Sequence, residues 1–418
     1  MKKCLTKRAR SFYPKAFITL CSISSLLAIS CKKPIQNALA KTVINQENKF
    51  KLSADPSYSA QKIFTGGLDG YHSYRIPSLI RTVEHGYLIA ICEGRNDNNK
   101  DYGNINIVCK RSFDDGVTWQ PLQAIAGPGN YTDGNPTTVV DQSTGKIFVF
   151  MLHNDSTHYS NPDGSYLAFQ PGDRTVWVCS STDEGATWSA PVNVTSTTQP
   201  SGTAQDWIGP GTGIYKLHGT DAGTLIIPAY GRNIYSTNHG ITWTESVITN
   251  GTTKSTESTI IEKLNGDLLR NDRPTSTLPL YRQVATGSLG GGFPTWASNT
   301  NLPDPASEGS VWRYNDPKPN RILFLNSASQ TTRTAMKIRI SYDEGTTYPI
   351  GRDIPSFGSS PGKLGGYSSL AKTADLQVGA LIEYNEDTGN SSTSHRSIVF
   401  HKFNLPWIVN GATEPVGY

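Results

Sequence analysis

The stretch STDEGATW, residues 181–188, belongs to an eight-residue pattern, Ser-x-Asp-x-Gly-x-Thr-Trp, that recurs along the chain. Three other good copies are SFDDGVTW at 112–119, STNHGITW at 236–243 and SYDEGTTY at 341–348, and a weaker fifth, SLGGGFPTW, covers 288–296. In chain order their first serines are 69, 55, 52 and 53 residues apart. Repeats with a period near 50 are typical of β-propeller blades, so the spacing indicates the architecture.

Each copy has the composition of a tight hairpin turn. The Ser hydroxyl and the Asp carboxylate can accept hydrogen bonds from nearby backbone N–H groups, and Gly tolerates the positive φ that such a turn requires. The aromatic residue that ends the pattern is expected to pack beneath the turn, at the start of the next strand. The repeats therefore predict architecture, but they do not predict activity.

Short apolar or alternating runs lie between the copies and predict strands. These runs are YLIAICEG, NINIVCKRS, KIFVFMLH, RTVWVCSS, TLIIPAYG, RILFLNSAS and AMKIRISYD, and no helical periodicity is found after residue 30. About 345 residues between Ile63 and Trp407 divide into six repeats of about 57. We therefore predict an all-β fold, a six-bladed β-propeller, over residues 61–418.

The first 30 residues have the pattern of a secretory signal. Six Lys or Arg residues without an acid accompany the apolar run AFITLCSISSLLAIS at 16–30, which is too short to span a bilayer comfortably. Cleavage before Cys31 would make it a lipid-modified N-terminus, although Ala28 stands at the usual leucine position; cleavage after Ala40 is the alternative. We predict an outer or cell-surface membrane lipoprotein, or a secreted or periplasmic protein, with residues 31–60 as a flexible lead-in.

Charge and composition exclude several kinds of partner. The formal net charge is +4, but without the six bases of the signal, 32 bases face 34 acids, so no basic surface for nucleic acid is indicated. Neither zinc-type His/Cys spacing nor a phosphate-binding loop occurs, and we predict no metal and no cofactor. Cys92, Cys109 and Cys179 lie in strand-like runs and are expected to be buried free thiols, with a Cys92–Cys109 bridge as the alternative.

A second motif, Tyr74-Arg75-Ile76-Pro77, precedes the first repeat. With the repeats that come after it, the chain resembles the bacterial exo-sialidase (neuraminidase) family, which has an F/Y-R-I-P motif and Asp-box (BNR) repeats. The resemblance covers nearly all of the chain after the lead-in. It implies the six-bladed propeller and the removal of terminal sialic acid from glycoproteins, glycolipids or oligosaccharides, and we expect a monomer.

The resemblance implies three arginines for the carboxylate of sialic acid. Arg75 stands in the R-I-P motif, Arg273 ends a stretch similar to the family's E-S…DG-L…N-x-R pattern, and Arg333 precedes the box at Ser341 by eight residues. Guanidinium groups suit this role because they are permanently charged and can bind a carboxylate bidentately.

The resemblance also implies the catalytic residues. Tyr367, in LGGYSSL, matches the tyrosine nucleophile, and Glu257 matches the base that takes its proton. A carboxylate nucleophile would be repelled by the carboxylate beside the reacting carbon, and sialidases with a Tyr nucleophile depart from the two-carboxylate scheme of glycosidases. Asp101 matches the acid/base, and Asp97 is its rival in the same loop.

Three further residues are predicted to bind substrate. Arg95 belongs to a run similar to the family's E-A-R…D-x-G-x-I-x-I pattern, whereas Asp133 and Trp207 lie in or beside Gly-containing segments that resemble loops between blades. Arg95 could instead pair with Glu93 or Asp97.

Two other functions stay open. A non-catalytic Asp-box propeller that binds glycans would not require the predicted catalytic and arginine residues, so their presence favours an enzyme. A trans-sialidase or intramolecular trans-sialidase would use the same residues as a hydrolase that proceeds through a tyrosine-linked covalent intermediate, and the motifs do not separate these reactions.

Overall fold

A computed structural model describes residues 55–127, 129–156, 169–248, 257–275, 279–315, 319–357, 363–386 and 395–415. These residues belong to one compact unit, Leu52–Tyr418. The predicted signal at 1–30, Cys31 and most of the lead-in at 31–60 lie outside the described residues, so these domain boundaries stay predictions. In the described part, strands predominate and the fold is all-β, as the sequence predicts.

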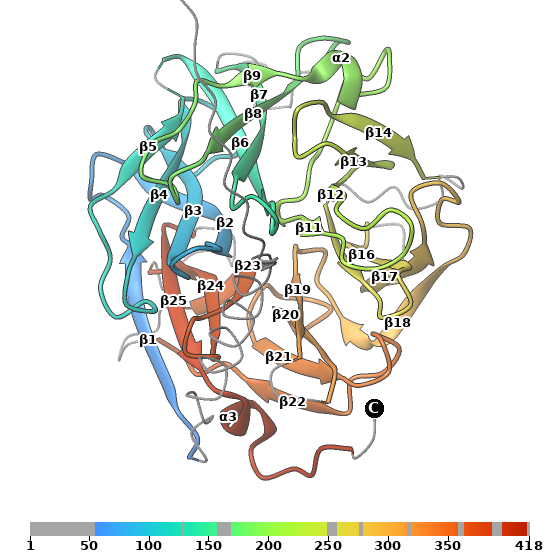
Figure 1. Ribbon diagram of the computed structural model, residues 1–418. Coiled ribbons are helices and arrows are strands. Elements are labelled where there is room, and N and C mark those ends of the chain that lie inside the picture. The colour runs from blue at the N-terminus through green and yellow to red at the C-terminus, as the bar shows by residue number, and fades with distance from the viewer. Residues whose placement is uncertain are drawn as a thin grey trace, which may run out of the picture. The chain divides into compact units, whose positions relative to one another are not determined.

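Four sheets have four strands each, and in three of them the strands follow one another in chain order. Their strands are β11 (Ile214–Tyr215), β12 (Leu225–Ala229), β13 (Arg232–Ser236) and β14 (Thr244–Val247); β15 (Ser258–Glu262), β16 (Leu268–Asp272), β17 (Tyr281–Gly287) and β18 (Trp296–Pro303); and β19 (Ser310–Tyr314), β20 (Arg321–Ser327), β21 (Met336–Ser341) and β22 (Ile350–Asp353). The order from β19 to β22 can be followed outward from the middle of the view in Figure 1.

The fourth of these sheets joins the two ends of the described chain. Its order is β1 (Tyr58–Phe64), β25 (Ser397–Phe403), β24 (Val378–Asn385) and β23 (Lys363–Lys372). The strand β1 pairs antiparallel with β25, with Tyr58 opposite Phe403. The last sheet is therefore completed by the first strand.

A nine-stranded sheet contains the remaining strands. These are β2 (Ser73–Arg81), β3 (Leu88–Arg95), β4 (Ile105–Ser112), β5 (Gln123–Ala126), β6 (Tyr131–Val140), β7 (Ile147–Asp155), β8 (Thr175–Ser181), β9 (Val192–Asn193) and β10 (Gly211–Thr212). The strands β4 and β6 meet only at the parallel pair Ile105 and Thr132, so the sheet consists of two antiparallel parts, β2–β5 and β6–β9, with β10 added on β6.

Early strands of successive sheets contact one another in a closed series. The contacts run from β2 to β6, from β6 to β12, from β12 to β15, from β15 to β19, from β19 to β23, and from β23 back to β2. Because these strands pack on neighbours at both faces, apolar residues are favoured at successive positions, and all residues of β3 and β20 are buried. Each of the seven apolar runs found in the sequence overlaps a strand.

The four good repeats form the turns that the sequence predicts. In the first, Ser112 Oγ accepts a hydrogen bond from Gly116 N at 2.8 Å, and Asp114 Oδ1 accepts one from Thr118 N at 2.8 Å. The glycine has a φ of 85°. The same bonds recur in the box at Ser181. Every copy, and the weaker fifth at 288–296, lies between the third and fourth strands of its sheet or half-sheet.

Each of the four good boxes also packs against a neighbouring sheet or half-sheet. A Cβ atom added to its glycine would lie under 3.0 Å from an apolar side chain of that neighbour. The pairs are Gly116 with Phe400 of β25, Gly185 with Ile89 of β3, Gly240 with Phe148 of β7, and Gly345 with Leu269 of β16. The glycine is therefore required twice, for its positive φ and for close packing.

The residue before each box glycine binds a hairpin of the preceding sheet. Asp115 accepts a bond from Ala374 N at 2.7 Å, and Glu344 accepts one from Leu264 N at 2.9 Å. The equivalent contacts join Glu184 to His85 N at 2.9 Å and His239 Nδ1 to Asp141 at 2.8 Å. The repeat thus connects neighbouring sheets as well as closing its own hairpin.

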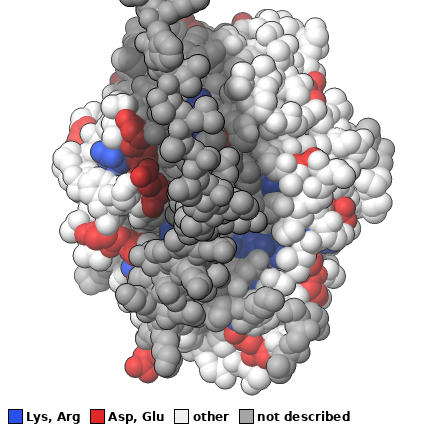
Figure 2. Space-filling model, in the orientation of Figure 1, with Lys and Arg blue, Asp and Glu red and all other residues white. Residues whose placement is uncertain are grey.

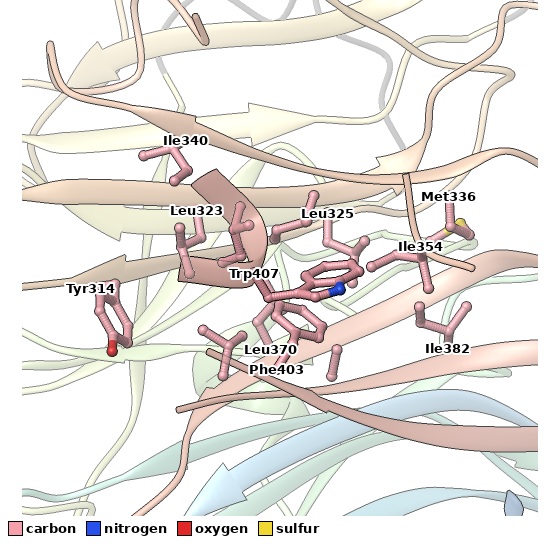
Figure 3. Close-up of a cluster of buried hydrophobic side chains, with 14 of the residues drawn as sticks. Tyr314, Leu323, Leu325, Met336, Ile340, Ile354, Leu370, Ile382, Phe403 and Trp407 are labelled. Carbon is pink, nitrogen blue, oxygen red and sulfur yellow. The ribbon is translucent and has the colours of Figure 1, made fainter. Parts of the chain in front are cut away.

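Two short helices were not predicted from the sequence: α2 (Thr195–Thr198) and α3 (Leu405–Val409). The Asn404 side chain caps α3 by accepting from Trp407 N, and Pro406 stands in its first turn, where no N–H is needed. Helix α3 places Trp407 in the core between the last two sheets, near Leu325 and Phe403 (Figure 3). It is too short to show helical periodicity in the sequence.

The cysteine prediction is confirmed, since Cys92, Cys109 and Cys179 are free and buried. The helices among the described residues are too short to cross a membrane.

The packing of the box glycines generates a stability prediction. Gly240→Ala should lower the free energy of unfolding by about 2–4 kcal/mol, because it adds backbone strain at φ 74° and a clash with Phe148. Gly231→Ala is the matched control: its φ is 64°, but an added Cβ meets nothing within 4 Å. Urea unfolding of both variants should show the smaller loss for Gly231→Ala, and equal losses would contradict the packing argument.

Candidate active site

A cavity of about 370 Å³ is lined by residues from the early strands and the loops next to them. Its lining includes five residues predicted from the sequence: Arg95, Asp101, Trp207, Glu257 and Tyr367. In Figure 2, Lys and Arg atoms are exposed in a hollow near the middle of the face shown. The cavity is thus a polar site that contains both signs of charge.

Tyr367, Glu257 and Arg273 form a hydrogen-bonded group. Tyr367 lies on β23, Glu257 directly precedes β15, and Arg273 directly follows β16. The Tyr367 hydroxyl donates to Glu257 Oε1, while Arg273 Nη1 donates to Glu257 Oε1 at 2.6 Å and to the Tyr367 hydroxyl at 3.1 Å. The backbone N–H of Arg273 also binds the Glu257 carbonyl at 3.0 Å, which fixes the two residues side by side.

This group has the arrangement of a nucleophile with its base. Burial, together with the negative charge of Glu257, raises the pKa of Tyr367 well above its ordinary value, although Arg273, Arg333 and Arg75 lower it. The phenol is therefore protonated near neutral pH and needs a base within hydrogen-bond reach in order to react. Glu257 is in that position.

Glu383 is a site residue that the sequence did not reveal. It lies fully buried on β24 and accepts four hydrogen bonds. Its Oε1 accepts from Arg75 Nε at 3.0 Å and from Ile76 N at 3.0 Å. Its Oε2 accepts from Arg75 Nη2 at 3.1 Å and from Tyr367 N at 3.0 Å. Burial raises its pKa, but the Arg75 charge and these hydrogen bonds outweigh burial and lower it to about 2. Glu383 is therefore an anion near neutral pH, and it connects Tyr367 on β23 with Arg75 on β2.

Arg75 also contacts the predicted acid/base. Its Nη1 lies 3.1 Å from Asp101 Oδ1, and Arg95 Nη2 lies 2.8 Å from the same oxygen. Burial tends to raise the pKa of Asp101, but the charges of Arg95 and Arg75 hold it below its usual range. Arg95 binds Glu93 Oε2 at 2.6 Å as well, so the alternative pairing with Glu93 is present. Arg95 also lines the cavity, and its contact with substrate stays a prediction.

The other predicted residues lie at different distances from this group. Arg333 is half-buried in the loop between β20 and β21, and its guanidinium carbon is 5.7 Å from the centre of the Tyr367 ring. Trp207 lines the cavity. Asp133 does not line it; its carboxylate binds His153 Nδ1 at 2.7 Å, while the next two residues, Gly134 and Asn135, line the cavity.

Arg174 is a second residue that the sequence did not single out. It lines the cavity, and its guanidinium carbon is 5.4 Å from the centre of the Phe169 ring and 5.8 Å from that of Trp207. Its Nε is buried without a hydrogen-bond partner in the described structure. Burial lowers the pKa of Arg174 from its ordinary value. The cavity thus has a further cationic wall between two aromatic rings.

One group among the described residues has the donor set of a metal site: Glu84, His85 and Glu184. His85 already binds Glu184 through its ring and its backbone N–H, as part of the contact between a box and the preceding hairpin. These residues do not line the cavity.

The arrangement suits a substrate that carries a carboxylate next to an electrophilic carbon. Arg75, Arg273 and Arg333 all lie within contact distance of Tyr367, so a carboxylate bound by them would place its neighbouring carbon near the phenolic oxygen. Asp101 stands on the exposed side of this group, with a side chain that is 65% exposed. A protonated carboxyl there could protonate a leaving group that faces solvent.

Comparison with known proteins identifies the family of this chain. The family model described as a BNR repeat-like domain matches residues 86–380. An exo-alpha-sialidase of Arthroderma benhamiae is 42% identical over 366 residues, which cover 82% of this chain and 86% of that protein. An exo-alpha-sialidase of Aspergillus fumigatus is 39% identical over 397 residues, with 90% of this chain and 94% of that protein covered.

Solved structures agree with the fold. The Hadza microbial sialidase Hz136 has 26% sequence identity and a TM-score of 0.70, over 84% of this chain and 69% of that one. The intramolecular trans-sialidase from Ruminococcus gnavus has 18% identity and a TM-score of 0.70, over 85% of this chain and 99% of that one, and it bears on the fold alone. From the extent of these matches, the chain belongs to the sialidase family with BNR repeats.

Proposed function

We propose that the protein is an exo-alpha-sialidase that removes terminal sialic acid by retaining hydrolysis, through a covalent intermediate on Tyr367. The observation that carries the mechanism is the hydrogen bond from the Tyr367 hydroxyl to Glu257, with Arg273 bound to both. Tyr367 is buried and protonated, and its hydroxyl is bound to a carboxylate that can take its proton, which is the arrangement that nucleophilic attack by a hydroxyl requires.

In this mechanism Arg75, Arg273 and Arg333 bind the sialic acid carboxylate. Asp101 protonates the glycosidic oxygen while Glu257 takes the Tyr367 proton and the phenolic oxygen attacks the anomeric carbon. Water then attacks the tyrosine-linked sugar, Asp101 takes the proton of that water, and Glu257 returns a proton to Tyr367. Two displacements restore the original anomeric configuration.

Hydrolysis is favoured over transfer by the relatives. The proteins at 39–42% identity over most of the chain are described as exo-alpha-sialidases. We expect water to be the acceptor, and sialylated glycoproteins, glycolipids or oligosaccharides to be the substrates of a monomeric enzyme. Arg95 and Trp207 are expected to contact the sugar from the cavity wall. Asp133 is expected to affect substrate binding only indirectly, by positioning Gly134 and Asn135, which line the cavity.

We further propose that the sheets form a six-bladed β-propeller. The two halves of the nine-stranded sheet and the four other sheets amount to six four-stranded units, and the closed series of contacts between their early strands supports a ring. In such a ring Arg75, Glu257, Arg273 and Tyr367, which stand on or next to early strands, converge at one end of the central axis.

The first test removes the nucleophile. Tyr367→Phe should lower kcat for a fluorogenic sialoside at least about 100-fold, since the attacking oxygen is absent while the ring and its packing remain. Tyr384, on β24, is also buried, and the control variant Tyr384→Phe should retain most of the activity. Near-wild-type turnover by Tyr367→Phe would refute the mechanism.

The second test addresses the buried anion at Glu383. Glu383→Gln should lower kcat/KM about 10- to 100-fold, because a neutral amide weakens the charge-assisted hydrogen bonds that orient Arg75. Glu386→Gln, which removes an ion pair with Lys62 outside the site, is the matched control and should retain activity. Thermal unfolding of both variants separates a local effect from loss of the fold; full activity in Glu383→Gln would contradict its positioning role.

The third test concerns the exported form, for which we propose a lipid anchor at Cys31. Cells that express the wild-type protein should incorporate radioactive palmitate into it, and Cys31→Ala should abolish the label because the acylated residue is lost. An unlabelled wild-type protein, with an N-terminus after Ala40, would favour the soluble secreted form instead.

A further inference from the structure

Asp101 is bound by arginines in a way that conflicts with its proposed task. As the acid it must carry a proton when substrate is bound, yet its Oδ1 lies 3.1 Å from Arg75 Nη1 and 2.8 Å from Arg95 Nη2. The two guanidinium groups are buried, with side-chain exposures of 6% and 2%, whereas the Asp101 side chain is 65% exposed, so water screens the ion pairs from the side of Asp101. An aspartate held in this way is an anion.

The position that Asp101 occupies is the one that a substrate carboxylate needs. Glu383 takes Nε and Nη2 of Arg75 in a bidentate pair, which leaves Nη1 as the nitrogen that binds Asp101. The N–H groups of Arg75 that remain are those of Nη1 and the second one of Nη2, so a sialic acid carboxylate that binds Arg75 through both terminal nitrogens would share Nη1 with Asp101. One substrate oxygen would then take the place of Asp101 Oδ1.

The charged groups around Asp101 determine whether it gains a proton once it is displaced. Arg75 faces it from β2, and Arg95 faces it from β3, where Arg95 is paired with Glu93. Two further arginines are near: Arg333 in the loop between β20 and β21, and Arg174 directly before β8. Glu257, which directly precedes β15 and accepts a hydrogen bond from Tyr367 on β23, adds one further acidic group. A bound substrate carboxylate would cancel the charge of Arg75 and repel the aspartate, which favours its neutral form.

We propose that Asp101 occupies the carboxylate-binding position of Arg75 in the free enzyme, and that binding of sialic acid displaces it and is coupled to the uptake of one proton by Asp101. This inference rests on the proposed function of the site. The proton comes from solvent and forms the O–H bond of the acid, and no other bond is made or broken. Substrate binding thus generates the acid form that the reaction then uses.

The coupling has a defined dependence on pH. Bound to the two arginines, the Asp101 carboxyl has a pKa below the usual range of an aspartate. Once the contact with Arg75 is replaced by a second carboxylate, its pKa should be higher. Between these two values binding takes up a proton, so affinity for a carboxylate ligand falls as pH rises, by up to about tenfold per unit. Above the higher value, affinity becomes independent of pH.

The test is isothermal titration calorimetry with free sialic acid as the probe. Titrations between about pH 5 and pH 7 use two buffers that both hold the pH in this range but differ in ionisation enthalpy, a dicarboxylate such as succinate and an amine such as bis-Tris. The difference between the two heats of binding measures the protons taken up. The wild type should take up close to one proton over part of this range. Asp101→Asn should take up no proton. Near pH 7 it should bind sialic acid about two- to fivefold more tightly than the wild type, because the exposed ion pair between Asp101 and Arg75 no longer competes with the ligand.

Asp97→Asn is the matched control, since Asp97 is an exposed aspartate of the same loop without a described ion pair to Arg75 or Arg95. It should take up protons as the wild type does. Equal uptake by wild type and Asp101→Asn, or no uptake by the wild type, would overturn the inference. Failure of the wild type to bind sialic acid would overturn the proposed function as well, whereas an active Tyr367→Phe would overturn only the mechanism.

Discussion

The site depends on one buried carboxylate. Glu383 has no access to solvent, and it is acceptable there as an anion because four hydrogen bonds and the charge of Arg75 compensate for its lost hydration. Its two oxygens connect three strands: β24, which carries it, β2 through Arg75 and Ile76, and β23 through Tyr367. Any shift of the predicted nucleophile relative to the predicted arginine would break at least one of these bonds.

The Asp boxes provide the rigidity that such an arrangement requires. The residues of the four good boxes do not line the cavity, but the glycine of each box and the residue before it contact a neighbouring sheet or half-sheet. The position of one sheet thus fixes the next, and the series of contacts between early strands closes on itself. Residues from separate sheets can therefore meet with the accuracy that hydrogen bonds between Tyr367, Glu257 and Arg273 demand.

The features that could be predicted from the sequence are those that a short local motif encodes. The boxes predicted hairpin turns because Ser, Asp and Gly act within eight residues, and Arg75 was found through the adjacent Ile-Pro. Glu383 stands in the run VGALIEYN, where a strand is evident but a buried ionised side chain is not. Its partners are more than 300 residues away or on another strand, so no local pattern marks it. Arg174 likewise directly precedes an ordinary strand, and only the fold brings it between Phe169 and Trp207.

The pairing of β1 with β25 determines the order in which the molecule can be assembled. As synthesis proceeds from the N-terminus, β1 emerges before the other described strands, but its partner β25 emerges more than 300 residues later. Until β25 is available, the backbone N–H and C=O groups that β1 uses to pair with β25 have no strand partner. Without β1, the last sheet would have one strand fewer. Completion of the fold is therefore a late, long-range event, and the contact that closes the last sheet is also the one with the largest loop-closure entropy.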